Sequence, residues 1–404
     1  MKNKLDYIKI FFLSLFLFVF LINGYTPIKY IGLSGAVLFY LIDLFLNFDK
    51  IKKIYIEYYQ DEKTLFILFS FILISIIISI IFSFSNSLPS WKEFRVEFLN
   101  IFLFMLVSLS VEKKELLKNI LFIATICAFV FDVFKFAYEY IKINPKLDFS
   151  IRLERIAAVY FDILIPFVFI SLFLIKNKIF KLLLSIIFLF GLFELFLIGA
   201  RGAWGTVFIE IFLIAVVLSL KFNYKKMFIY LGIVFILLIM GGYLIYKNSY
   251  LIQTKIHQGL NPNGRDKIVE TRLPIFLKHS NLFIGVGGPD NYQYNRFLNF
   301  YHAPKKYGVQ EGNNFHYWSD EPFLLQIFYK EGILGLIAFL AFSIVFIFKL
   351  YKNLNLFTLA ILVSFVGYYF VRGLAEGRNF KYLIFYFMLY LIFKEKDENS
   401  LRIS

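Results

Sequence analysis

Cysteine and proline are nearly absent from this 404-residue chain. The single cysteine, Cys127, excludes an intramolecular disulfide and any cluster of cysteine metal ligands. Because Cys127 lies inside an apolar run, we expect it to be a small residue of the core. Proline occurs nine times, whereas Phe, Ile and Lys are abundant. We interpret that bias as a property of an AT-rich genome, which carries no information about function.

Histidine is also scarce, and its placement is informative. The four histidines lie at His257, His279, His302 and His316, a stretch that also holds three of the ten arginines. Histidine and arginine move protons and hold phosphates near neutral pH, so this stretch is expected to carry chemistry. The intervals of 22, 23 and 14 residues between the histidines do not match a metal site. We therefore expect no metal and no cofactor.

Charged residues make up 18% of the chain and hydrophobic residues 60%, with a mean hydropathy of +0.71, which excludes a soluble globular domain. Apolar runs of about 20 residues recur, and each is long enough to cross a bilayer as a helix. The expected fold class is an all-α, polytopic integral membrane protein. Twelve spans are predicted, at 8–24, 28–47, 64–84, 95–112, 118–138, 157–175, 180–199, 203–220, 227–246, 330–349, 355–372 and 379–394. The first run lacks a small-x-small cleavage motif, so we expect an uncleaved helix.

Lysine indicates the topology of these spans. With Met1 inside, every segment expected on the inner side is rich in lysine, and both termini lie inside. Three regions follow: helices one to nine in 1–247, a large outer loop that carries the candidate site in 248–329, and three more helices with an inner tail in 330–404. The net charge of +15, mostly from lysine on the inner side, favours contact with anionic membrane lipids. No basic domain lies outside the membrane, so nucleic acid is not an expected partner.

Arginine is distributed differently from lysine. Only Arg402 is expected inside, whereas the other nine fall on or near the outer face: Arg95, Arg152, Arg155, Arg201, Arg265, Arg272, Arg296, Arg372 and Arg378. One explanation is snorkelling of cations at helix ends. The other is an anionic ligand, because the guanidinium group grips phosphate with two hydrogen bonds.

Arg201 is the leading candidate for binding such an anionic ligand. It lies between two apolar spans in Gly199-Ala200-Arg201-Gly202-Ala203, where a charge that faced lipid would be costly and small residues permit close approach. Arg152 and Arg155 precede the sixth span with a spacing that would place both on one helix face, although Glu154 could pair with either.

The loop ends in a dense polar segment that runs into the tenth span. His316 and the two carboxylates of Asp320 and Glu321 are the candidates for a general base that deprotonates a hydroxyl. Tyr317 and Trp318 could stack on a sugar ring, or belong to the aromatic belt at the membrane interface. Earlier in the loop we expect a helix from Asp266 to Leu273 that Pro274 breaks, followed by glycines that permit tight turns.

These features together resemble the O-antigen ligase and polymerase superfamily over roughly residues 150–350. Gly264-Arg265, His279 and Leu282-Phe283-x-Gly285-x-Gly287 are similar to the family's "GR…HPLFGVG" stretch. Leu325-Gln326-Ile327, followed by Gly332-Ile333-Leu334-Gly335-Leu336, is similar to the segment after its catalytic histidine.

The resemblance implies a metal-independent, inverting glycosyltransferase in the bacterial inner membrane with a periplasmic active face. Its donor would be a glycan on undecaprenyl diphosphate. Arg201 and Arg265 would bind the diphosphate, with Arg272, Arg152 and Arg155 as further candidates, and a histidine would act as the base. At the position of the family's His-x-His-Asn motif this chain has Glu321, and the nearest histidine is His316. Either residue could be the base, and we favour His316, with Glu321 as the alternative.

Three acceptors fit that architecture. A ligase transfers the glycan to a sugar of lipid A–core, a polymerase transfers it to another lipid-linked unit, and an oligosaccharyltransferase transfers it to protein. One long loop dominates here and the segment 139–156 is short, which favours the ligase. A multi-span transporter is the alternative of a different class, but the sequence has no matched half-repeat.

Overall fold

The computed structural model describes residues 2–22, 25–144, 156–222, 227–257, 265–305, 307–312, 314–318, 321–374, 376–377 and 379–394. About 83% of it is helical, and seven helices are long and apolar enough to cross a membrane. Shorter apolar helices lie at Asn100–Ser110, Val159–Leu174 and Lys381–Phe393. The predicted class, an all-α protein embedded in a membrane, is thus confirmed, while the number of twelve spans stays a prediction.

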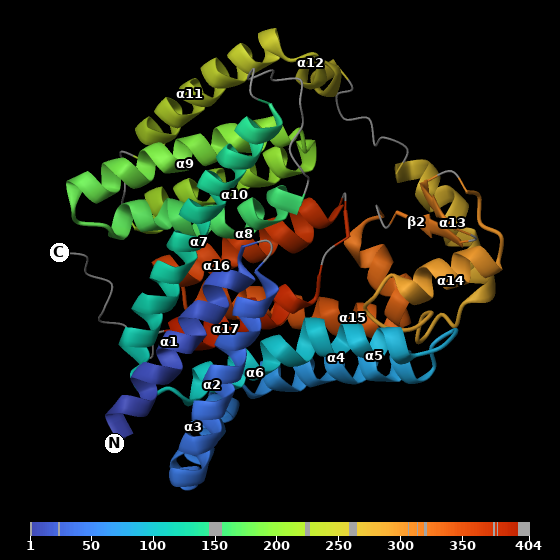
Figure 1. Cartoon of the computed structure of the whole chain (residues 1–404), viewed down its shortest axis with the longest axis horizontal. Coiled ribbons are helices and arrows are strands. Elements are labelled where there is room, and N and C mark those ends of the chain that lie inside the picture. Colours follow the sequence, from blue (N-terminus) through green and yellow to red (C-terminus); the bar gives the residue numbers. More distant parts are fainter. Residues whose placement is uncertain are drawn as a thin grey trace.

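The elements follow one another along the chain in a bundle with one region beside it (Figure 1). The first group is α1 Lys2–Phe20, α2 Thr26–Leu46, α3 Phe48–Asp61, α4 Lys63–Ile81, α5 Leu88–Phe94, the π-helical turn η1 Arg95–Leu99, α6 Asn100–Ser110, α7 Lys114–Ile143, α8 Ile156–Leu174, α9 Lys178–Ile198, α10 Arg201–Lys221 and α11 Met227–Asn248. The second group is α12 Tyr250–His257, α13 Arg265–His279, α14 Tyr292–Phe300, β1 Gly308–Glu311, β2 Asn314–Tyr317, α15 Phe323–Lys352, α16 Leu356–Val366, η2 Gly367–Val371, η3 Arg372–Leu374 and α17 Lys381–Phe393.

Each predicted span overlaps a helix, and segments expected on one side of the membrane meet at one end of the bundle. Glu62, between α3 and α4, forms ion pairs with Lys394 Nζ at 2.9 Å and Lys349 Nζ at 3.1 Å. The described part of the loop, with α13, α14 and the strands, lies at the other end of α4 and α15 (Figure 1).

Large apolar side chains build the core of the bundle. Every residue of α17 from Tyr382 to Phe393 is buried, so this helix lies at the centre. Side-chain packing holds the helices together, because lipid supplies little hydrophobic drive between them. In α7 the buried residues recur every three or four positions, as at Leu117, Leu121, Ala124 and Ala128. Cys127 lies off that stripe and is exposed, so the expectation that it belongs to the core was wrong.

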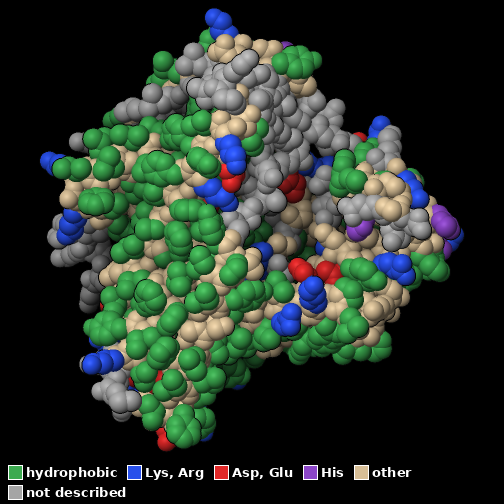
Figure 2. Space-filling model, viewed as in Figure 1, with side chains coloured by type: hydrophobic (Ala, Val, Ile, Leu, Met, Phe, Trp, Pro, Cys, Tyr) green, Lys and Arg blue, Asp and Glu red, His purple; other side chains and the backbone are tan. Residues whose placement is uncertain are grey.

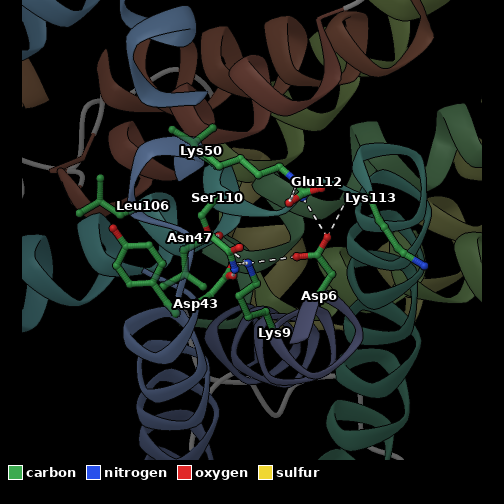
Figure 3. Close-up of polar contacts among 12 residues, drawn as sticks. Asp6, Lys9, Asp43, Asn47, Lys50, Leu106, Ser110, Glu112 and Lys113 are labelled. Atoms are coloured by element: carbon green, nitrogen blue, oxygen red, sulfur yellow. Dashed lines mark hydrogen bonds and ion pairs between the residues drawn. The ribbon is translucent and has the colours of Figure 1, made fainter. Parts of the chain in front are cut away.

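A buried lysine joins the N-terminal helices, as Figure 3 shows. Lys9 Nζ lies 2.6 Å from Asp43 Oδ2 and 3.0 Å from Asp6 Oδ1. The other oxygen of Asp6 accepts hydrogen bonds from the backbone N–H groups of Glu112 and Lys113 at 3.1 and 3.3 Å. Lys9 pairs with both carboxylates, and backbone N–H groups satisfy the second oxygen of Asp6, so the cluster can remain buried. It fastens α1 to α2 and to the chain after α6.

The loop region has a small aromatic core of its own. Phe276 of α13 stacks on Tyr329 of α15 with ring centroids 4.0 Å apart, and Tyr294 and Phe297 of α14 pack against it. The strands β1 and β2 form an antiparallel hairpin in which Val309 is paired with His316. Pro274 lies inside α13, which continues to His279, so the predicted break at Pro274 was wrong. A proline removes one backbone donor, and the remaining hydrogen bonds and the core contacts of Phe276 sustain the helix.

Two glycine segments fasten this region to the bundle. The backbone N–H groups of Val286 and Gly287 donate to the carbonyls of Tyr329 and Lys330, both at 3.0 Å, and Ile333 N–H donates to Leu282 O at 2.9 Å. The contact depends on a break in α15 at Gly332, where φ is +69°. At Gly332 a Cβ would collide with the backbone of Phe283. The segment 282–287 and the segment around Gly332, which belong to the two motifs quoted above, are therefore joined by backbone hydrogen bonds.

The Gly332→Ala substitution is expected to lower the free energy of unfolding by about 2–4 kcal/mol, because it combines backbone strain with a backbone collision. Thermal unfolding of the purified protein in detergent measures the loss. Gly205→Ala is the matched control, since Gly205 lies within helix α10 and a Cβ there meets nothing within 4 Å. This control should be neutral or slightly stabilising. Equal unfolding temperatures for Gly332→Ala and the wild type would contradict the prediction.

Candidate functional site

A buried arginine lies where α8, α10 and η3 meet. Arg372 is 1% exposed, and its Nη1 lies 3.2 Å from Oδ2 of Asp162, which is fully buried on α8. On its other edge, Arg372 Nε and Nη2 donate to Oε2 of Glu376 at 3.1 and 2.9 Å. Two carboxylates thus contact different edges of the Arg372 guanidinium group, which fixes its position.

Two further arginines reach the same place from distant parts of the sequence. Arg265, at the first turn of α13, donates from Nη2 to the other carboxylate oxygen of Glu376 at 3.1 Å. Arg201 begins α10, and a Cβ on the next residue, Gly202, would lie 3.2 Å from Cδ of Arg372. The positive end of the α10 dipole therefore lies beside Arg372. The predicted pair Arg201 and Arg265 converges on Arg372, a residue that was noted on the outer face but not assigned to the site.

This concentration of positive charge is suited to a polyanion. Arg372, Arg265 and the N-terminus of α10 lie together there, so two guanidinium groups and the positive end of a helix dipole are concentrated at one place. The exposed fraction rises from 1% for the side chain of Arg372 to 21% for Glu376 and 23% for Arg265, so the cluster is reached from the side of these last two residues. Figure 2 shows basic and acidic side chains at the border between the bundle and the loop region, while the bundle itself is mostly hydrophobic.

A second buried ion pair lies in the loop region. Arg272 Nη1 donates to Glu321 Oε1 at 2.6 Å and to the carbonyl of Trp318 at 2.7 Å, and Nη2 donates to the carbonyl of Tyr307 at 2.9 Å. Burial alone would lower the pKa of Arg272, but the oxygens of Tyr294 and Glu321 outweigh it and hold the pKa above its usual value. Its guanidinium is thus charged and engaged in joining α13 to the end of the loop. In the structure Arg272 therefore has a structural role. The predicted contact of Arg272 with a diphosphate stays a prediction.

Glu321 is the buried acid of this pair. It is fully buried, and its Oε1 accepts hydrogen bonds from Arg272 and from the phenol of Tyr294. Burial, with the charge of Glu321, raises the pKa of Tyr294 well above its ordinary value, so the phenol keeps its proton and donates it. The second oxygen, Oε2, has no hydrogen-bond partner in the described part of the chain. One oxygen is therefore held in place while the other keeps its capacity to accept.

The two centres are linked by Gln326, in the first turns of α15. Its side-chain amide donates to the backbone carbonyl of Glu321 at 3.3 Å. The residue after Glu376 is Gly377, at which a Cβ would collide with the Gln326 side chain. The Gln326 side chain therefore lies between the backbone of Glu321 and that of Gly377, the residue after Glu376.

The other predicted residues lie apart in the loop. His316 is exposed on β2. Tyr317 is buried, and its phenol donates to the carbonyl of Ala303 at 2.7 Å, while Trp318 is 50% exposed. Of the two rings proposed to stack on a sugar, Trp318 is the one with an accessible face. Arg152 and Arg155 lie outside the described residues.

Three residues of the arginine cluster were not predicted as site residues: Asp162, Arg372 and Glu376. The sequence did contain a signal, because a charged residue within or at the end of an apolar span is unusual. Asp162 lies within one predicted span, and Arg372 ends another. No spacing in the sequence pairs them, because they are 210 residues apart.

No group of three or more metal-ligating side chains occurs among residues that the structure describes. In comparisons with protein-family models and with curated proteins, nothing matches the chain.

Proposed function

We propose that the chain is a membrane glycosyltransferase similar to O-antigen ligases. In this proposal it transfers a glycan from undecaprenyl diphosphate to a sugar of lipid A–core at the periplasmic face of the bacterial inner membrane. The observation that supports it is the convergence of Arg201, Arg265 and Arg372 at the end of the apolar bundle that carries the loop region. An isoprenoid diphosphate needs this combination, because its tail remains in lipid while its charge is bound at the edge.

The arginines would act on the leaving group. The acceptor hydroxyl oxygen attacks the anomeric carbon, the bond from that carbon to the diphosphate oxygen breaks, and undecaprenyl diphosphate departs with the electron pair. Negative charge grows on the diphosphate in the transition state, so fixed guanidinium groups stabilise that state more than the ground state. A single displacement inverts the anomeric configuration.

Glu321 is the better supported base. Its Oε2 is buried and without a hydrogen-bond partner among the described residues, and Arg272 and Tyr294 fix the rest of the carboxylate. A carboxylate held in this way can accept the proton of the acceptor hydroxyl. His316 is the alternative, on an exposed strand of the same region. In either case the proton leaves the acceptor oxygen as the new glycosidic bond forms.

Polymerase and protein oligosaccharyltransferase activities share this chemistry and differ in the acceptor. Deletion of the gene separates them. Lipopolysaccharide that ends at the core, with accumulation of lipid-linked polymer, identifies a ligase. Single repeats that are still attached to core identify a polymerase.

Arg201→Ala and Arg265→Ala should each reduce glycan transfer by roughly 100-fold or more when they complement the deletion strain, since each removes one cation from the leaving-group site. Transfer is measured as polymer-bearing lipopolysaccharide per amount of membrane-inserted protein. Arg296→Ala is the control, because Arg296 is exposed on α14. If both variants transferred as well as the control, the assignment of the diphosphate site would be wrong.

A further inference from the structure

Glu376 holds an unusual position in the arginine cluster. One carboxylate oxygen contacts Arg265 at 3.1 Å, and the other accepts from Nε and Nη2 of Arg372 at 3.1 and 2.9 Å. The single carboxylate thus bridges two arginines through separate oxygens. A phosphate group has the same charge sign and the same ability to accept from two guanidinium groups at once.

The second carboxylate of the cluster has a different relation to Arg372. Asp162 is fully buried and contacts Arg372 at Nη1, whereas Glu376 is 21% exposed and lies on the more accessible edge. Asp162 can keep Arg372 in position when Glu376 leaves. Glu376 lies in the irregular segment between η3 and α17 and has three side-chain torsions, so a rotamer change is sufficient to withdraw its carboxylate.

The charges favour such an exchange. With Glu376 in place, its two oxygens occupy Nη2 of Arg265 and the Nε and Nη2 groups of Arg372. When Glu376 withdraws, these donors become available to an anion that can accept from both arginines, as a diphosphate can. If Glu376 stayed between Arg265 and Arg372, an incoming diphosphate would meet a negative charge at contact distance, which is strongly unfavourable in a partly buried site.

We propose that Glu376 is an internal competitor that occupies the headgroup site in the unliganded protein and is displaced by the lipid diphosphate. This inference rests on the proposed function and adds regulation to the same site. Glu376 balances the charge of Arg265 and of the buried Arg372 when no donor is bound. After transfer, its return to Arg265 and Arg372 promotes release of undecaprenyl diphosphate.

The test measures binding of inorganic pyrophosphate to the purified full-length protein in detergent by isothermal titration calorimetry at constant ionic strength. Glu376→Gln and Glu376→Ala should each bind pyrophosphate about tenfold more tightly than the wild type, since the competing charge is gone. Glu270→Gln is the control with the same change of charge, because Glu270 is exposed on α13, the helix that carries Arg265. It should bind as the wild type does.

Other outcomes separate this inference from the proposed function. Equal or weaker binding by folded Glu376→Gln, with wild-type binding that Arg265→Ala abolishes, overturns the role of Glu376 and leaves the diphosphate site standing. If the Glu376 variants bind pyrophosphate and the wild type does not, the result supports the role of Glu376 as a competitor. Absence of binding by every protein overturns both. Unfolding temperatures identify a variant that fails to fold, and Glu376→Gln then carries the test because it keeps the size and hydrogen-bonding capacity of the side chain.

Discussion

Arg372→Ala should reduce the free energy of unfolding by about 3–5 kcal/mol, because it removes the guanidinium group that forms an ion pair with the fully buried Asp162 carboxylate. Glu376 loses two of its hydrogen bonds in the same variant. Glycan transfer should also disappear, since the cluster loses the cation around which Arg265 and Arg201 are arranged. Thermal unfolding in detergent and transfer in the deletion strain measure the two effects.

A double variant separates stability from anion binding. In Arg372→Leu with Asp162→Leu, neither buried charge remains, and replacement of a buried ion pair by apolar side chains is often neutral or stabilising. We expect its unfolding temperature to return towards the wild-type value while transfer remains absent. Recovery of transfer with recovery of stability would show that Arg372 supports the fold only, and that the diphosphate is bound elsewhere.

Glu321→Gln should lower transfer by roughly 10²- to 10⁴-fold, the range for loss of a general base. The amide oxygen can still accept from Arg272 and Tyr294, so the variant changes the charge more than the geometry. Part of the stability is also expected to be lost, because Arg272 stays buried and charged beside a neutral partner. Initial transfer rates normalised to folded protein, with the unfolding temperature measured in parallel, distinguish the two contributions.

Two further variants decide between the candidate bases. Tyr294→Phe removes a hydrogen bond to Glu321 and keeps the charge of the carboxylate. Transfer should therefore fall by roughly 10- to 100-fold, the effect of one hydrogen bond to a charged group. His316→Ala should retain most of the activity if Glu321 is the base. Full activity of Glu321→Gln together with loss in His316→Ala would assign the role to the histidine instead.

Much of the fold follows from local properties of the sequence. Apolar runs of helix length had to become helices, since lipid leaves no other way to pair the backbone, and each predicted span overlaps one. Glycines such as Gly285 and Gly287 permit positive φ, and both have it in the structure. Two local predictions were wrong. Cys127 lies off the packed stripe of α7, and Pro274 does not end α13, because in each case neighbouring contacts outweigh the property of one residue.

The candidate site likewise contains residues that the sequence predicted and partners that only the tertiary structure placed. Composition and periodicity were sufficient to identify a membrane-embedded, all-α protein, and residue type and place in the chain singled out Arg201. The resemblance to the O-antigen ligase superfamily added Arg265 and directed attention to Glu321. Their partners depended on the tertiary structure. Asp162 and Arg372 are 210 residues apart, and Arg272 and Glu321 are 49 apart. Only packing of α8 against α10 and η3, and of the loop region against α15, brings these charges into contact. A buried charge requires a partner wherever the fold can supply one, and its sequence distance plays no part in that requirement.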